Sequence, residues 1–205
     1  MSTLIALEHW PRRAAFEHFR RLGQPFFSLC ARVDVSGLDA RIASVPGATR
    51  FLAYHHAALC AINAIEPFRM RLDGEGIRLH ARVHGSTTLL KHDDTVAFAD
   101  LPFDTDFGRF VASALPAIAA ARAAPFALGQ DTEAAVYMTT IPWLDFTQFT
   151  HALPGDSADS VPRLAFGKIV NGSMPVAVEV HHALVDGLQV GQFYAAMEAA
   201  LNHNI

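Results

Sequence analysis

The segment His181–Gly187 (HHALVDG) places two histidines and an acid between a strand-like and a helix-like stretch. Residues 174–180 (MPVAVEV) alternate as a half-buried β-strand does, and from Leu188 onward the apolar residues follow a helical spacing. A histidine at such a junction suits a general base, because its usual pKa of about 6.5 leaves it mostly neutral at cellular pH. The spacing therefore indicates deprotonation of an alcohol or a thiol.

The alternation also predicts where each histidine points. If the strand continues past Val180, His182 joins the buried valine face and His181 falls on the face of Glu179. A histidine in an apolar strand is often a hydrogen-bonded core residue instead, and this motif alone does not separate the two interpretations.

Three further segments, taken with HHALVDG, carry a family resemblance. Residues 10–20 read WPRRAAFEHFR, residues 138–143 read MTTIPW, and the helix-like residues 51–65 are followed by Phe-Arg-Met-Arg at 68–71. In this order they resemble the chloramphenicol acetyltransferase family, whose chains open with W-x-R-R-x-x-F-E-x-[FY], contain S-x-x-P-W and close with HHxxxDG and a helix. Dihydrolipoyl acyltransferases, condensation domains and plant acyltransferases share HHxxxDG, so the W-x-R-R segment is what separates this family from them.

The resemblance implies an α/β (α+β) two-layer sandwich, with a mixed β-sheet covered by helices on one face, as one domain over residues 1–205. It implies a CoA-dependent O-acetyltransferase that moves an acetyl group from acetyl-CoA to a hydroxyl of chloramphenicol or a similar small molecule. Acetyl-CoA is then a co-substrate, and no cofactor is bound permanently. Family members are homotrimers whose active sites lie at subunit interfaces, so the same assembly is expected here.

Four residues take catalytic or structural roles by this resemblance. His182 is the general base, and Thr139, where the family has serine, donates a hydrogen bond to the oxyanion of the tetrahedral intermediate. Asp186 forms a structural ion pair with Arg12, whose guanidinium is always charged and can hold a carboxylate through two hydrogen bonds. Breaking such a pair costs roughly 3–5 kcal/mol where its burial is deep.

The expected acceptor pocket departs from the family at five positions. His18 and Phe19 stand in place of a phenylalanine-tyrosine pair, which removes a phenolic hydroxyl. Pro25 and Phe26 replace a cysteine-glycine pair, and Ala165 occupies the place of a threonine that helps to hold a water molecule. The chemistry is therefore expected to be kept, with either chloramphenicol or a different alcohol or thiol as the acceptor.

A catalytically silent homologue that only binds a ligand is the other alternative. The retention of His182, Asp186, Arg12 and a hydroxyl at position 139 argues against it.

Composition restricts partners and location. The 205 residues are 51% hydrophobic, which allows one substantial core, and the net charge of −4 disfavours nucleic acid as a partner. The opening residues do not form a cleavable signal, and the alanine-rich stretch 111–124 is too short and interrupted to cross a membrane. We therefore expect a cytoplasmic enzyme, with Cys30 and Cys60 as reduced, buried thiols.

The histidines do not indicate a metal site. His55 and His56 are adjacent on a predicted helix and point about 100° apart, which is poor geometry for binding one ion. One of them is expected in the core and the other on the surface.

Periodicity and capping residues predict the order of the elements. Helices are expected at residues 12–22, 38–44, 50–64 (after Thr49 as N-cap), 106–123 and from 188 onward. Strands are expected at residues 26–35, 68–72, 77–84, 95–101, 135–141, 164–170 and 174–180.

Overall fold

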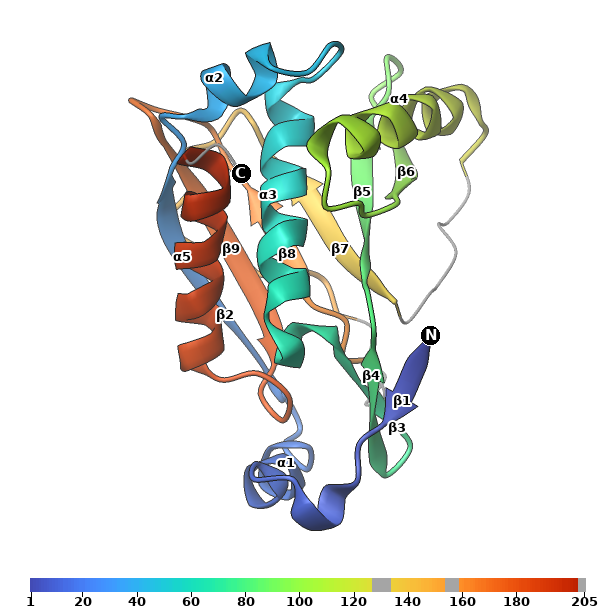
Figure 1. The fold of residues 1–205 in the computed structure, drawn as a ribbon, viewed down its shortest axis with the longest axis vertical. Helices are drawn as coiled ribbons and strands as arrows, with labels where there is room; N and C mark the ends of the chain where they lie inside the picture. The colour runs from blue at the N-terminus through green and yellow to red at the C-terminus, as the bar shows by residue number, and fades with distance from the viewer. Residues whose placement is uncertain (127–133, 154–158, 203–205) are drawn as a thin grey trace.

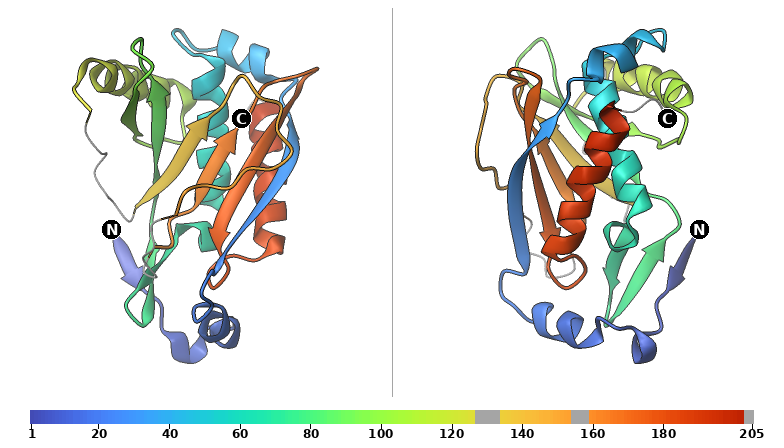
Figure 2. Two further views of the ribbon diagram at one scale, coloured as in Figure 1. Left: turned by 180° about the vertical axis from the view of Figure 1, so that it is seen from behind. Right: turned by 60° about the vertical axis from the view of Figure 1, so that its left-hand side comes forward.

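The computed structural model describes residues 1–126, 134–153 and 159–202. Its main layer is a six-stranded mixed sheet in the order β2-β9-β8-β7-β5-β6. The strands are β2 (Phe26–Asp34), β5 (His84–Leu90), β6 (Val96–Leu101), β7 (Ala135–Thr140), β8 (Arg163–Phe166) and β9 (Ser173–His181). Helices α3 (Arg50–Ala64), α4 (Phe107–Ala123) and α5 (Gly187–Asn202) lie together on one face of this sheet (Figures 1 and 2). The predicted two-layer arrangement is confirmed.

A smaller unit lies at the end of the molecule where the chain begins (Figure 1). It contains a three-stranded sheet in the order β1-β4-β3 and the helix α1. Its elements are β1 (Ser2–Leu4), α1 (Arg13–Phe19), β3 (Met70–Asp73) and β4 (Gly76–His80), with short 3-10 turns at Leu7–His9 and Glu66–Arg69. The helix α2 (Leu38–Ala43) lies at the opposite end (Figure 1).

Helix α3 is the centre of the helical layer. Thr49 caps it as predicted, since its side chain accepts a hydrogen bond of 3.2 Å from the Leu52 backbone N–H. Ten of its 15 residues are buried. A helix that is apolar on nearly all sides belongs in a core, and α3 packs there between the sheet, α4 and α5.

Strand β9 is buried on both faces. Val176, Val178 and Val180 pack into the core beneath the helices. The segment that follows β7 covers the other face, where the His151 backbone N–H donates to Glu179 Oε2 of β9 at 3.0 Å. The strand ends at His181, which is buried, and the His182 side chain is 34% exposed. The condition under which His182 would join the buried valine face is therefore not met, because the strand ends at His181.

Strand β5 (HGSTTLL) was not predicted, because its sequence lacks apolar alternation. It nevertheless pairs parallel with β7 and antiparallel with β6. Its polar residues are stabilised by partners: Thr87 is fully buried, and its Oγ1 lies 3.0 Å from His55 Nε2 on α3.

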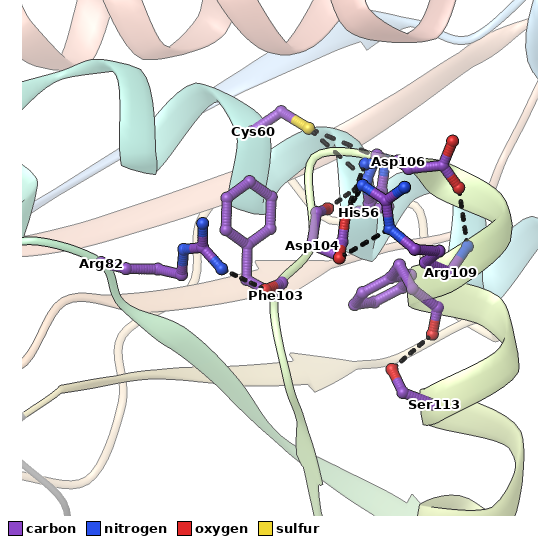
Figure 3. Close-up of polar contacts among 9 residues, drawn as sticks. His56, Cys60, Arg82, Phe103, Asp104, Asp106, Arg109 and Ser113 are labelled. Carbon is purple, nitrogen blue, oxygen red and sulfur yellow. Dashed lines mark hydrogen bonds and ion pairs between the residues drawn. The ribbon is translucent and has the colours of Figure 1, made fainter.

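His55 and His56 are both buried, which corrects the expectation that one of them is a surface residue. His56 Nδ1 lies 2.8 Å from Arg41 Nη2. On the other side of the ring, His56 Nε2 lies 2.9 Å from the Asp104 carbonyl oxygen (Figure 3). A guanidinium only donates, so Nδ1 accepts and Nε2 donates to the carbonyl. His56 is thus a hydrogen-bonded link between α2, α3 and the segment that leads into α4.

These buried histidines predict acid sensitivity. Burial lowers the pKa of His55 to about 3, and that of His56 and of His181 to about 4. A lowered folded-state pKa gives stability that is fully present above the unfolded pKa of about 6.5 and is lost as the pH falls toward the folded values. Between pH 6 and pH 5 we expect the free energy of unfolding to fall by about 1 kcal/mol for each of the three groups.

Urea unfolding at pH 7, 6 and 5 measures this loss. The variant His92→Gln changes an exposed histidine and should keep the same pH slope. Equal stability at pH 7 and pH 5 would contradict the prediction.

Candidate active site

His182 lies at the turn between β9 and α5, next to α1. The Phe19 ring stacks on its imidazole with a centroid distance of 3.8 Å and an interplanar angle of 13°, and the Phe27 ring lies at 4.8 Å. The His182 backbone N–H donates to the Pro25 carbonyl at 2.8 Å. Helix α1 and the start of β2 therefore hold the half-exposed ring in one place.

Arg12 and Asp186 are in contact, as the sequence predicts. Arg12 Nη2 lies 2.8 Å from Asp186 Oδ1, while Nη1 donates to the Leu184 carbonyl. The guanidinium thus contacts one carboxylate oxygen and one backbone oxygen, and does not hold both carboxylate oxygens. The Arg12 side chain is 20% exposed and that of Asp186 39%, so losing one partner should cost less than the roughly 3–5 kcal/mol of a deeply buried pair.

Asp186 also faces the ring of His182. Its Oδ1 is 3.1 Å from His182 Nδ1, although the atoms are not aligned for a linear hydrogen bond. A carboxylate offers only acceptor atoms, so the contact favours the tautomer with its proton on Nδ1. Nε2 then carries the free lone pair that a general base needs.

His181 has a different environment. It is buried, its Nδ1 accepts a hydrogen bond of 3.2 Å from the Ala183 N–H, and Phe26 packs edge-to-face against it at 5.2 Å. Burial lowers its pKa to about 4 and shields the ring from solvent. Of the two histidines, only His182 has the exposure that a general base requires.

Three of the predicted pocket residues, His18, Phe19 and Pro25, lie around His182, and the other two do not. Exposed His18 packs edge-to-face on Phe19 at 5.0 Å, and together with Pro25 it lies around His182. Phe26 contacts His181 and not the ring of His182. Ala165 is fully buried on β8, beside Thr139, and belongs to a different part of the sheet.

Thr139 and His182 are far apart within one chain. Across the sheet, Thr139 pairs with Ala165, and Ala165 pairs with Ala177 of β9. His182 follows Ala177 by five positions at about 3.3 Å each, and two strand spacings of about 4.8 Å separate β9 from β7, which gives a separation on the order of 20 Å. His182 and Thr139 therefore do not form one site inside a single subunit.

Thr139 is on the face of β7 that the helices do not cover. Its neighbour Met138 points into the core, and the Thr140 hydroxyl accepts a hydrogen bond from Tyr54 of α3 at 3.3 Å. Thr139 is half-buried, and its Oγ1 lies 2.9 Å from Thr88 Oγ1 on β5. The sequence pattern does not point to Thr88, because the strand that carries this residue lacks apolar alternation.

The described structure also bears on metal-binding groups, cysteines and long apolar helices. Within residues 1–126, 134–153 and 159–202, no group of three His, Cys, Asp or Glu side chains is placed to hold a metal ion. Cys30 and Cys60 are free, and burial raises the pKa of the Cys60 thiol to about 11. Among the helices of the described ranges, none is long and apolar enough to cross a membrane.

Sequence comparisons with known proteins all point to one family. A sequence model of the chloramphenicol acetyltransferase family matches residues 1–198. A chloramphenicol acetyltransferase of Streptomyces acrimycini is 29% identical over 205 residues, covering 96% of this chain and 93% of the relative. One from Clostridium perfringens is 25% identical over 209 residues, covering 98% and 95%.

A solved chloramphenicol acetyltransferase structure superposes with a TM-score of 0.86 at 28% identity, covering 98% of this chain and all of that one. The dihydrolipoamide acetyltransferase of Azotobacter vinelandii shares the fold at 15% identity, with a TM-score of 0.69 over 92% of this chain and 86% of its own. With matching motifs, fold and full-length relatives, the chain belongs to the chloramphenicol acetyltransferase family and is an acyltransferase.

Proposed function

We propose that the protein transfers the acetyl group of acetyl-CoA to a hydroxyl of chloramphenicol or a similar small molecule, and so confers antibiotic resistance. The observation that carries this proposal is His182, half-exposed, stacked on Phe19 and presenting Nδ1 to Asp186, which leaves Nε2 free as a base. Acetyl-CoA is a co-substrate, and the reaction needs no permanently bound cofactor. Because acetyl-CoA is an intracellular metabolite, we place the activity in the cytoplasm.

In this mechanism His182 Nε2 removes the hydroxyl proton while the acceptor oxygen attacks the thioester carbonyl. A carbon–oxygen bond forms and the carbonyl oxygen becomes an oxyanion, to which the Thr139 hydroxyl donates a hydrogen bond. When the intermediate collapses, the carbon–sulfur bond breaks and the departing CoA thiolate takes the proton from His182. Acetylated acceptor and free CoA thiol are the products.

The separation of His182 from Thr139 supports a homotrimer with interfacial sites. Because one chain does not bring the two together, Thr139 of a neighbouring copy would complete the site around each His182. None of the helices α3, α4 and α5 covers the face that carries Thr139, since all three lie on the other side of the sheet (Figure 2).

The identity of the acceptor depends on the side chains that line its pocket. Phe19 has no hydroxyl, and its face is occupied by the imidazole of His182. Ala165 has no polar group beside Thr139. These positions favour, as the second candidate, transfer to a different alcohol or thiol. A silent binding homologue would not need the Arg12–Asp186–His182 contacts that this chain keeps.

Release of free thiol tests the proposal. Purified protein is incubated with acetyl-CoA alone, with acetyl-CoA and chloramphenicol, or with acetyl-CoA and one of a panel of other alcohols and thiols. The masses of the products are then measured by mass spectrometry. We expect thiol release that depends on chloramphenicol and equals the amount of acetylated drug. Release with other acceptors only would support the second candidate, and no release with any acceptor would support a binding homologue.

A further inference from the structure

Two hydroxyl groups meet on the uncovered face of the sheet. Strands β5 and β7 run parallel with Thr87 opposite Met138, which brings Thr88 beside Thr139. Their Oγ1 atoms are 2.9 Å apart, and both residues are half-buried. The contact is therefore a hydrogen bond at the edge of solvent, where a substrate can reach it.

The neighbouring threonines show how this pair differs from ordinary strand hydroxyls. Thr87 and Thr140 point toward the helices, where their hydroxyls contact His55 and Tyr54. Thr88 and Thr139 point the other way. In the described part of the chain, the Thr88 hydroxyl has no side-chain partner besides Thr139. Its hydrogen-bonding capacity is directed at the residue proposed to stabilise the oxyanion.

The direction of this hydrogen bond follows from the number of protons. A threonine hydroxyl has one proton to donate and two lone pairs to accept with. If Thr139 donates to the oxyanion, it has no second proton for Thr88, so Thr88 must be the donor of the pair. A hydroxyl that accepts one hydrogen bond becomes a stronger donor of its own, because linked hydrogen bonds polarise one another.

We propose that Thr88 is a positioning residue for acetyl transfer: it donates to Thr139 Oγ1, holds that hydroxyl in one rotor state and leaves its proton for the oxyanion. This role rests on the proposed function. It makes Thr88 important for the rate of the chemical step and unimportant for binding of either substrate.

A double-mutant cycle tests the role. Thr88→Val removes the hydroxyl and keeps the β-branched shape, and Thr139→Ala removes its partner. We expect Thr88→Val to lower kcat by about tenfold, the effect of one lost hydrogen bond, with KM for acetyl-CoA and acceptor changed less than about twofold. Thr139→Ala should lower kcat by ~10²–10³. In the Thr139→Ala background, Thr88→Val should have no further effect.

Two variants serve as controls, each checked by thermal unfolding. Thr88→Ser keeps the hydroxyl and should restore kcat to near the unmodified value. Ser86→Ala removes a hydroxyl two positions earlier on the same face of β5, opposite Tyr137 and not Thr139, and should leave kcat unchanged.

The outcomes separate this inference from the function on which it rests. If Thr139→Ala is slow but Thr88→Val is as fast as the unmodified enzyme, or is equally harmful with and without Thr139, the positioning role is overturned and the proposed function stands. If Thr139→Ala is itself fully active, the oxyanion assignment fails, and the role of Thr88 fails with it.

Discussion

Replacing His182 by alanine is expected to lower kcat for acetyl transfer by about 10²–10⁴-fold, the usual contribution of a positioned general base. The structure gives the reason: Nδ1 faces Asp186, the ring stacks on Phe19, and Nε2 is the remaining basic atom. The side chain is 34% exposed, so its removal should alter the free energy of unfolding little.

The measurement is thiol release at saturating acetyl-CoA and acceptor, together with CoA binding by calorimetry. His18→Ala is the matched control, since His18 is exposed and contacts Phe19. It should change KM for the acceptor more than it changes kcat. A His182→Ala enzyme that binds CoA and turns over at the unmodified rate would place the base elsewhere.

The second large effect concerns mixed assemblies. In the proposed mechanism and trimer, subunits carrying His182→Ala lack the base and subunits carrying Thr139→Ala lack the oxyanion donor, so each variant alone should be nearly inactive. In trimers formed from an equal mixture, a site is complete where a subunit with His182 meets a neighbour with Thr139. For random assembly this holds at about a quarter of the interfaces of a cyclic oligomer.

Refolding the two variants together should therefore restore about a quarter of the unmodified activity. Mixing them without refolding, while each stays in its own assembly, is the control and should restore none. If the refolded mixture stays inactive, the base and the donor act from the same subunit, which would require the chain to bring β7 and the end of β9 much closer than this fold does.

The sequence predicts the helices better than the strands. Thr49 and the apolar run after it predict α3 at its observed bounds, because a cap and a buried helix are both visible locally. The helix predicted at 12–22 is shorter, at Arg13–Phe19. Strand β5 escapes prediction because the groups that stabilise its polar residues, such as His55, come from another element.

In the candidate site, too, contacts between distant elements are harder to predict from sequence than local structure. The resemblance brings Arg12, Asp186 and His182 together, and their contacts are present in the structure. The stacking of Phe19 on His182, the tautomer favoured by Asp186 and the pairing of Thr88 with Thr139 depend on side-chain directions that no spacing rule contains. The separation of Thr139 from His182 follows from strand register, which becomes known only with the order of the sheet.

The contact between Arg12 and the turn after β9 also has a consequence for biosynthesis. Arg12 bonds the carbonyl of a residue 172 positions later. At about 5–20 residues per second, a ribosome needs roughly 10–35 s to make the intervening chain. During that time Arg12 has no contact with the Leu184 carbonyl. A nascent or prematurely terminated polypeptide therefore lacks the turn that presents His182. The contact between Arg12 and this turn thus forms only after residue 184 has been synthesised.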